Sequence, residues 1–143
     1  MAVIFIALGS NLGDRLSYIE KAVVLLKASG VVVQRLSRVI ETNPVGGPAQ
    51  GKYLNAVLKA QTDLTPEELH ALTQSIESKM GRVRKILNGP RVIDIDILLY
   101  DDVKLITRKL IIPHPRMCGR DFVMNPLKEI APQVYQELLD ASC

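Results

Sequence analysis

Five consecutive residues, from Ile93 to Ile97, alternate strictly between isoleucine and aspartate. Successive side chains of a β-strand point to opposite faces, so Asp94 and Asp96 share one face, about 7 Å apart at Cα, and the isoleucines share the other. Asp is depleted in strands, and Mg²⁺ prefers one or two carboxylates together with substrate phosphates. The pattern therefore predicts a strand with one buried face and a metal-binding pair on the other. A half-buried strand with a solvated acidic face is the alternative.

A segment rich in glycine and basic residues, 81–91, precedes this strand and contains Arg82, Arg84 and Arg91. The guanidinium fork of arginine matches phosphate oxygens. Carboxylates can hold the magnesium that neutralises the same phosphates. Together the two patterns indicate a magnesium–nucleotide site. The alternative is a solvated basic loop that folds back and pairs with the two aspartates.

Composition limits the class of protein. With 143 residues and 48% hydrophobic content, the chain is long enough for one compact domain, residues 1–143. A net charge of +3 does not by itself argue for nucleic acid. The apolar run 2–8 is short and lacks a basic flank, which favours a buried strand over a signal peptide or a membrane span. Cys118 and Cys143 lack metal-type spacing, which favours reduced cysteines and a cytoplasmic location.

Periodicity and turn residues divide the chain into alternating elements. We expect strands at 2–8, 31–41, 53–61 and 91–100 with a short return strand at 103–106, a helix at 14–29 with Leu16, Ile19, Val23 and Leu26 on its apolar stripe, a second helix that starts at Thr65–Pro66 and ends before Gly81, and helical stretches near Arg120 and Pro132. The order predicts a ferredoxin-like α+β sandwich, βαββαβ, with an added β-hairpin and C-terminal helices. In that topology the first and fourth strands are neighbours, which we expect to bring Asp94 and Asp96 near the middle of the sheet and away from its rim.

Several motifs resemble one known family, the 6-hydroxymethyl-7,8-dihydropterin pyrophosphokinases of folate biosynthesis. The matching stretches are Ala7-Leu8-Gly9-Ser10-Asn11-Leu12-Gly13, Tyr53-Leu54-Asn55-Ala56, Gly81-Arg82-Val83-Arg84, Gly89-Pro90-Arg91-Val92-Ile93-Asp94-Ile95-Asp96-Ile97-Leu98 and Pro113-His114-Pro115. The resemblance runs from residue 2 to about residue 132. It implies transfer of pyrophosphate from ATP to the hydroxymethyl group of the pterin, with release of AMP.

The resemblance also implies roles for individual residues on the ATP side. Asp94 and Asp96 would hold two Mg²⁺ ions, and Arg82 and Arg91 would join them as catalytic residues. The ATP-binding set that the resemblance implies is Gln74, Glu77, Arg82, Arg84, Arg91, Ile97, His114 and Arg120. Without the resemblance, His114 between two prolines could equally be a loop residue bonded to backbone.

The pterin side is implied at six positions: Thr42, Pro44, Val45, Tyr53, Asn55 and Phe122. A flat heterocycle stacks on aromatic faces, and the chain has two Phe, four Tyr and no Trp. We therefore expect Tyr53 and Phe122 to stack on the two faces of the pterin ring. The alternative is that they are ordinary core aromatics. The amide of Asn55 offers both donors and an acceptor to the amide-like edge of a pterin.

Other classes of function fit the sequence less well. A ferredoxin-like RNA-binding module would carry aromatic residues on its central strands, whereas apolar and acidic residues stand there. A metal-dependent nuclease would need a further acid or histidine beside the pair, and a small-molecule-sensing domain would not need the arginine segment. A Walker-type loop is excluded because no Gly-x-x-x-x-Gly-Lys-Ser/Thr occurs. We therefore expect small-molecule substrates as partners, with no nucleic acid and no membrane, and adjacent folate-pathway enzymes as the candidate protein partners.

Overall fold

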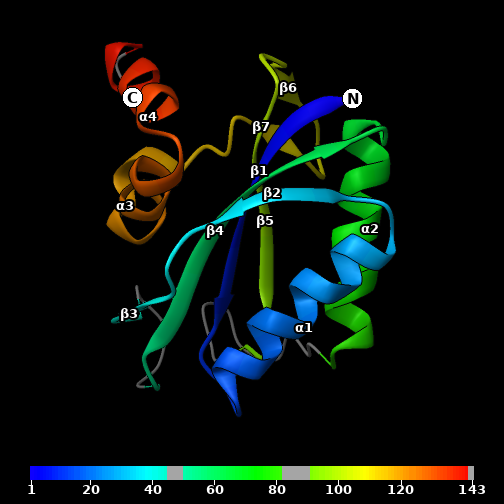
Figure 1. Ribbon diagram of the computed structural model, residues 1–143, viewed down its shortest axis with the longest axis vertical. Helices are drawn as coiled ribbons and strands as arrows, with labels where there is room; N and C mark the ends of the chain where they lie inside the picture. Colours follow the sequence, from blue (N-terminus) through cyan, green and yellow to red (C-terminus); the bar gives the residue numbers. More distant parts are fainter. Residues whose placement is uncertain (45–49, 82–90, 142–143) are drawn as a thin grey trace.

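The computed structural model describes residues 1–44, 50–81 and 91–141, and is built on a five-stranded antiparallel sheet flanked by helices (Figure 1). The strands of this sheet are β1 (Ala2–Ser10), β2 (Val32–Leu36), β3 (Ile40–Thr42), β4 (Tyr53–Thr62) and β5 (Asp94–Tyr100). The other elements are α1 (Arg15–Ala28), α2 (Pro66–Lys79), the hairpin strands β6 (Leu105–Ile106) and β7 (Ile111–Ile112), the 3₁₀ turn η1 (Met117–Gly119), α3 (Asp121–Ile130) and α4 (Pro132–Asp140). The strand order is β2-β4-β1-β5, and β3 also pairs with β4.

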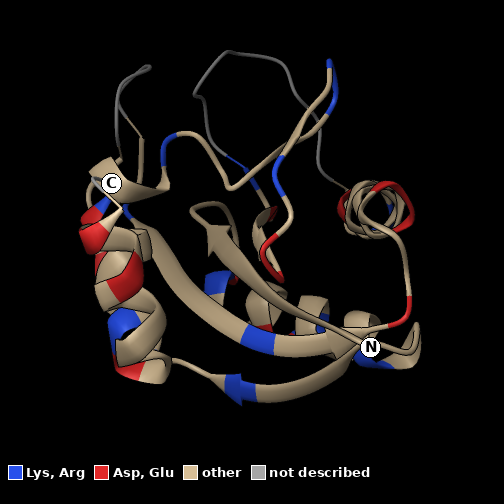
Figure 2. Ribbon diagram, turned by 90° about the horizontal axis from the view of Figure 1, so that it is seen from above, with Lys and Arg blue, Asp and Glu red and all other residues tan. Residues whose placement is uncertain are grey.

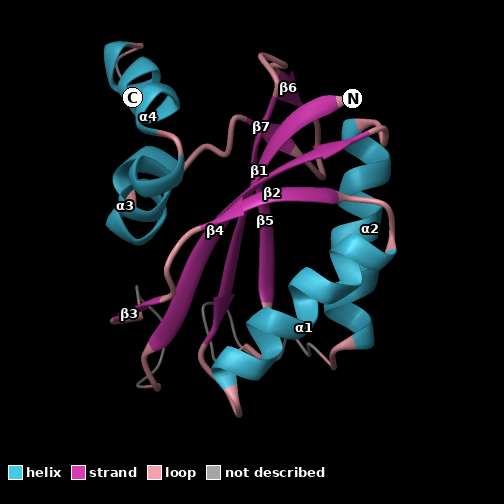
Figure 3. Ribbon diagram, in the orientation of Figure 1, coloured by secondary structure: helices cyan, strands magenta, loops and turns pink. Residues whose placement is uncertain are grey.

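Helices cover both faces of the sheet, α1 and α2 on one side and α3 and α4 on the other (Figure 3). Along β1, Ile4 and Ile6 belong to the core under α1 and α2, whereas Phe5 belongs to the core with Val123 and Leu127 of α3. Because both faces are buried, the run 2–8 is apolar at every position. The βαββαβ order with an added hairpin and C-terminal helices is confirmed.

Both long helices begin where the sequence predicts. Asp14 caps α1 by accepting a hydrogen bond from the main-chain N of Ser17, and Thr65 forms a capping box with Glu68 at the start of α2. The apolar stripe predicted for α1 is wrong at Leu16, which is 47% exposed. Ala22, which the predicted stripe did not include, is buried together with Ile19, Val23 and Leu26.

The strand predicted at 31–41 is interrupted, so that β2 and β3 pair with separate parts of β4. At the break, the main-chain N of Ser37 donates to the carbonyl of Val57, and the Ser37 hydroxyl accepts from the main-chain N of Val57. A side-chain oxygen thus replaces a backbone carbonyl in the ladder. Serine side chains can hydrogen-bond to nearby backbone groups and thereby compete with the regular hydrogen bonds between strands.

The aspartate-bearing strand β5 lies next to β1 as predicted, but it is the last strand of the sheet, so the expected central position of Asp94 and Asp96 is wrong. Among the described residues, no strand pairs with β5 on the side away from β1. Two of its outward-facing backbone groups are paired by other means. The buried carboxylate of Glu77 accepts from the main-chain N of Ile95 at 2.7 Å, and the main-chain N of His114 donates to the carbonyl of Leu98 at 3.0 Å.

Two further sequence expectations concern the cysteines and membranes. Cys118 in η1 is disulfide-bonded, so the expectation of reduced cysteines is wrong there, since sequence separation does not reveal which cysteines approach within bonding distance. Cys143 lies outside the described residues. In the described part of the chain, no helix combines the length and apolar character needed to cross a membrane.

Candidate functional site

A cavity of about 400 Å³ lies on the sheet face that carries Asp94 and Asp96. This volume is within the range of small-molecule sites. Its walls come from β1, from the ends of β3 and β4, from β5 and from the segment that leads into α3. The lining residues are Ala7, Leu8, Gly9, Thr42, Asn43, Gln50, Tyr53, Asn55, Ala56, Arg91, Asp94, Asp96, His114, Pro115, Arg116, Arg120, Phe122 and Val123.

The strand register places three of these residues in one row across the sheet. Gly9 of β1 pairs with Asn55 of β4 on one side and with Asp94 of β5 on the other. At the usual spacing of neighbouring strands, Asn55 and Asp94 lie about 10 Å apart at Cα. A Cβ at position 9 would stand 3.1 Å from Oδ1 of Asn55 and 3.4 Å from Cδ1 of Tyr53, so the glycine keeps the floor of the cavity open.

The acidic end of the row is an ion pair. Nη1 of Arg91 contacts Oδ1 and Oδ2 of Asp94 at 3.2 and 3.3 Å, with both side chains less than one fifth exposed. The sequence alternative in which an arginine folds back onto the aspartates is thus realised for Arg91 and Asp94. Asp96 lies one alternation further along the same face.

The carboxylates of Asp94 and Asp96 suit a hard divalent cation whose other ligands come from a bound substrate. Among the described residues, no group of three or more His, Cys, Asp or Glu is gathered that could hold a metal by protein ligands alone. Mg²⁺ is commonly bound by one or two carboxylates and completes its shell with waters and phosphate oxygens. Asp94 and Asp96 therefore fit Mg²⁺ together with a phosphorylated substrate.

The opposite end of the cavity combines aromatic and amide groups. Nδ2 of Asn55 donates to Oγ1 of Thr42 at 2.5 Å, which orients the amide. Tyr53 and Phe122 both line the cavity, and the guanidinium of Arg120 lies 5.5 Å from the centroid of the Phe122 ring. These groups can stack on a flat ring and hydrogen-bond to its edge.

A second cavity, of about 230 Å³, adjoins the first and shares Asp96, His114 and Pro115 with it. Its other walls are α2, β5 and the β6–β7 hairpin, with two basic residues on the hairpin. The remaining lining residues are His70, Thr73, Gln74, Ile95, Ile97, Arg108, Lys109, Leu110 and Ile111. The two cavities therefore meet at Asp96, His114 and Pro115.

His114 stands at this junction as a hydrogen-bond donor. Its Nδ1 accepts from the main-chain N of Arg116 at 3.2 Å, so a neutral ring carries its proton on Nε2. Burial lowers the pKa of His114, and the positive charges of Arg120 and Arg116 lower that pKa further. The neutral tautomer therefore persists at physiological pH and can donate from Nε2.

The structure brings together most of the residues expected at the site. The first cavity gathers Thr42, Tyr53, Asn55, Phe122, Arg91, Asp94, Asp96, His114 and Arg120, and the second gathers Gln74 and Ile97. Pro44 and Glu77 line neither cavity, and Glu77 instead bonds to β5. Val45, Arg82 and Arg84 lie outside the described residues.

Sequence reasoning missed other lining residues, among them Gln50, Arg108, Lys109 and Arg116. For Arg108 and Lys109 the signal was the basic pair in the turn of the added hairpin, which is where a phosphate-binding loop could stand. Figure 2 shows that both basic and acidic positions occur along the described part of the chain.

Comparison with known proteins gives one consistent result. Residues 5–132 match the family described as 7,8-dihydro-6-hydroxymethylpterin-pyrophosphokinase (HPPK). The chain is 46% identical over 140 residues to the 2-amino-4-hydroxy-6-hydroxymethyldihydropteridine pyrophosphokinase of Bacillus subtilis, covering 97% of this chain and 84% of that protein. It is 46% identical over 134 residues to the enzyme of the same name from Aquifex aeolicus, covering 94% of this chain and 83% of that protein.

Solved structures agree on the fold. The crystal structure of Plasmodium falciparum HPPK-DHPS superposes with a TM-score of 0.68 at 14% identity, covering 92% of this chain and 40% of that chain.

Proposed function

The chain belongs to the 7,8-dihydro-6-hydroxymethylpterin-pyrophosphokinase family, and on that basis we propose how its two adjoining cavities divide the reaction. The protein transfers pyrophosphate from ATP to the hydroxymethyl group of 6-hydroxymethyl-7,8-dihydropterin in folate biosynthesis. The observation that carries the proposal is the shared wall, Asp96 with His114 and Pro115, between a cavity with aromatic and amide groups and one with basic groups.

We assign the pterin to the end of the first cavity where Asn55 is held by Thr42. Tyr53 and Phe122 stack on the two faces of the ring, and Asn55 bonds to its amide-like edge. Because Gly9 has no side chain, the hydroxymethyl group extends over β1 toward Asp94 and Asp96. Pro44 and Val45 remain expectations from the family resemblance.

We assign the nucleoside of ATP to the second cavity, beside Gln74 and Ile97, with the triphosphate crossing the shared wall. Arg91, Arg120 and the Nε2–H of His114 then face the phosphates, as charged and neutral donors. Arg91 already lies against Asp94, so a phosphate that enters shares its guanidinium with the carboxylate. Arg82 and Arg84 remain expectations for the same phosphates.

Mg²⁺ dependence, with two ions held by Asp94 and Asp96, belongs to the same proposal. When bound there, Mg²⁺ would neutralise charge on the triphosphate and lower the pKa of the attacking hydroxyl. The protein itself supplies orientation. The hydroxymethyl oxygen must approach the β-phosphorus in line with the bond that breaks, and the row Asn55, Gly9, Asp94 sets that direction.

The reaction forms a bond from the hydroxymethyl oxygen to the β-phosphorus and breaks the bond from that phosphorus to the oxygen bridging to the α-phosphate. AMP leaves with the electron pair, and the hydroxyl proton is lost to solvent. Attack at the γ-phosphorus would release ADP instead.

The test is chromatography of a reaction that contains ATP, the pterin and Mg²⁺. We expect AMP and pterin pyrophosphate in equal amounts, with no turnover when EDTA is added. ADP as the main product, or consumption of ATP that does not depend on the pterin, would overturn the assignment.

Because the P. falciparum relative is a single HPPK-DHPS chain, an adjacent folate-pathway enzyme is the candidate partner.

A further inference from the structure

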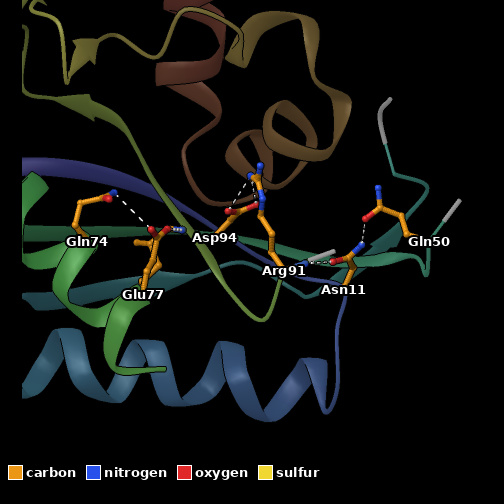
Figure 4. A network of polar contacts seen from close by, with 7 residues as sticks. Asn11, Gln50, Gln74, Glu77, Arg91 and Asp94 are labelled. Atoms are coloured by element: carbon orange, nitrogen blue, oxygen red, sulfur yellow. Dashed lines mark hydrogen bonds and ion pairs between the residues drawn. The ribbon is translucent and has the colours of Figure 1, made fainter. Parts of the chain in front are cut away.

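Asn11 is a buried polar residue immediately after β1 that the reaction described above does not use. It is 6% exposed, and it is absent from the described residues that line the two cavities. It nevertheless contacts residues from two separate parts of the cavity wall (Figure 4). Its contribution must therefore act through those neighbours.

The side chain of Asn11 joins two distant segments. Nδ2 donates to Oε1 of Gln50 at 2.7 Å and to the carbonyl of Gly51 at 3.1 Å. Oδ1 accepts from the main-chain N of Arg91 at 2.8 Å, and the main-chain N of Asn11 donates to the carbonyl of Arg91 at 3.1 Å. The orientation of the amide is determined, because the N–H of Arg91 can only donate and the carbonyl of Gly51 can only accept.

The two segments have different tasks under the proposed function. Gln50 lines the first cavity, and Gly51 leads into β4, where Tyr53 and Asn55 stand. Arg91 lines the same cavity at its acidic end and pairs with Asp94. Asn11 therefore fixes the pterin end and the phosphate end relative to each other through one amide group.

We propose that Asn11 is a positioning residue, which holds the Gln50–Gly51 segment in place for binding of the pterin and holds Arg91 in place for the transfer of pyrophosphate. The inference rests on the proposed function. The chemistry of the side chain is specific, since the position requires one acceptor and one donor on the same planar group. Aspartate has the same size and supplies only acceptors, whereas leucine has a similar size and supplies neither.

The test uses Asn11→Asp and Asn11→Leu in the full chain, with Asn125→Asp as the matched control because Asn125 is exposed on α3. The Asp variant keeps an acceptor for the N–H of Arg91 and places an oxygen against the carbonyl of Gly51. We expect its KM for the pterin to rise about tenfold, with KM for ATP and kcat changed less than twofold. The Leu variant also loses the acceptor for Arg91, so its kcat should fall about tenfold in addition.

A purely structural role predicts a different pattern. Loss of folded enzyme lowers kcat and leaves both KM values unchanged, and that result for the Asp variant would overturn the proposal. A double-mutant cycle adds a second check, because Gln50→Leu should cost little more when Asn11→Asp is already present. Additive effects on KM for the pterin would show that Asn11 does not act through Gln50.

The two hypotheses fail separately. Wild type and Asn125→Asp must form AMP from ATP and the pterin, and their failure to do so would reject the proposed function. Equal kinetic constants for Asn11→Asp and wild type would reject the role of Asn11 alone.

Discussion

Asn55 on β4 and Asp94 on β5 pair with the same residue of β1, Gly9, from its two sides. The group that we assign to the pterin edge and the group that we assign to the metal are thereby held in one row by backbone hydrogen bonds, with no side chain between them. A spacing set by the ladder is more rigid than one set by loops.

Gly9→Ala tests this relationship. The new methyl would stand 3.1 Å from Oδ1 of Asn55, so the amide must shift by a few tenths of an ångström. We expect KM for the pterin to rise by about tenfold with little change in KM for ATP. Gly119→Ala is the control, because a Cβ at that position meets nothing within 4 Å. An unchanged KM for the pterin in Gly9→Ala would show that the Asn55 amide can shift without loss of pterin binding.

Substitution of the two aspartates should separate activity from stability. Asp94→Ala and Asp96→Ala should each lower turnover at least a hundredfold, as measured by AMP release over a titration of Mg²⁺. From the sequence alone, loss of a like charge predicts equal or greater stability for both variants. For Asp94→Ala, however, the ion pair predicts a loss of stability of about 1 to 3 kcal/mol, since the mostly buried guanidinium of Arg91 loses its hydrogen bonds to Asp94. Near-native turnover at saturating Mg²⁺ would contradict the metal assignment, and urea unfolding checks the stability.

Tyr53→Ala and Phe122→Ala should each weaken pterin binding, because a stacking partner contributes about 0.5 to 1.5 kcal/mol beyond area burial. Isothermal titration with the pterin and, separately, with a non-hydrolysable ATP analogue measures both affinities. The affinity for ATP should change little. Equal losses for both ligands would identify these aromatics as core residues.

Gln74 and Glu77 lie one turn apart on α2, yet the structure gives them different tasks. Gln74 lines the second cavity and donates from Nε2 to Oε1 of Glu77 at 3.5 Å, at the limit of hydrogen-bond length, so Gln74→Ala should raise KM for ATP and lower the unfolding free energy less than Glu77→Ala does. Glu77 accepts from the backbone of β5 in a buried position, so Glu77→Ala should lower stability by about 1 to 3 kcal/mol. A raised KM for ATP in Glu77→Ala, with unchanged stability, would support the expectation that Glu77 contacts the nucleoside.

The pKa of His114, lowered by burial and then by Arg120 and Arg116, makes stability depend on pH. Its folded pKa lies below the unfolded value of about 6.5, so the unfolded chain binds the proton first as pH falls. The protein should therefore lose stability below about pH 6.5, and His114→Gln should lose less than wild type in denaturant titrations at pH 7 and pH 5. His70→Gln is the control. An equal loss in wild type and His114→Gln would contradict the prediction.

The sequence predicted the face that the aspartates share and where both long helices begin, because strand alternation and helix-start signals are local properties. It did not predict that β5 is the last strand, since Ile93–Ile97 is buried on one face whether a partner strand, a helix or a hairpin covers its outer side. The interruption at Ser37 was missed because the β-branched residues Val31–Val33 before it and Val39–Ile40 after it favour a strand.

The sequence predicted which residues belong to the site more fully than it predicted where they lie relative to one another. Asp94, Asn55 and Tyr53 stand in motifs, whereas Arg108 and Lys109 reach the second cavity only through the fold of the β6–β7 hairpin. Glu77 illustrates the limit of reading positions from a resemblance, because spacing on a helix does not reveal whether a carboxylate faces a cavity or a backbone N–H.

The hydrogen bonds on the outer side of β5 also affect how copies of the protein meet in a crowded solution. An edge strand with unpaired backbone groups invites strand addition from another chain, which is a common first step of aggregation. Here the N–H of Ile95 and the carbonyl of Leu98 are already engaged by Glu77 and by the backbone of His114. The strand that bears Asp94 and Asp96 can thus stand at the margin of the sheet with its face lining a cavity, while its outer side is a poor template for a neighbouring polypeptide.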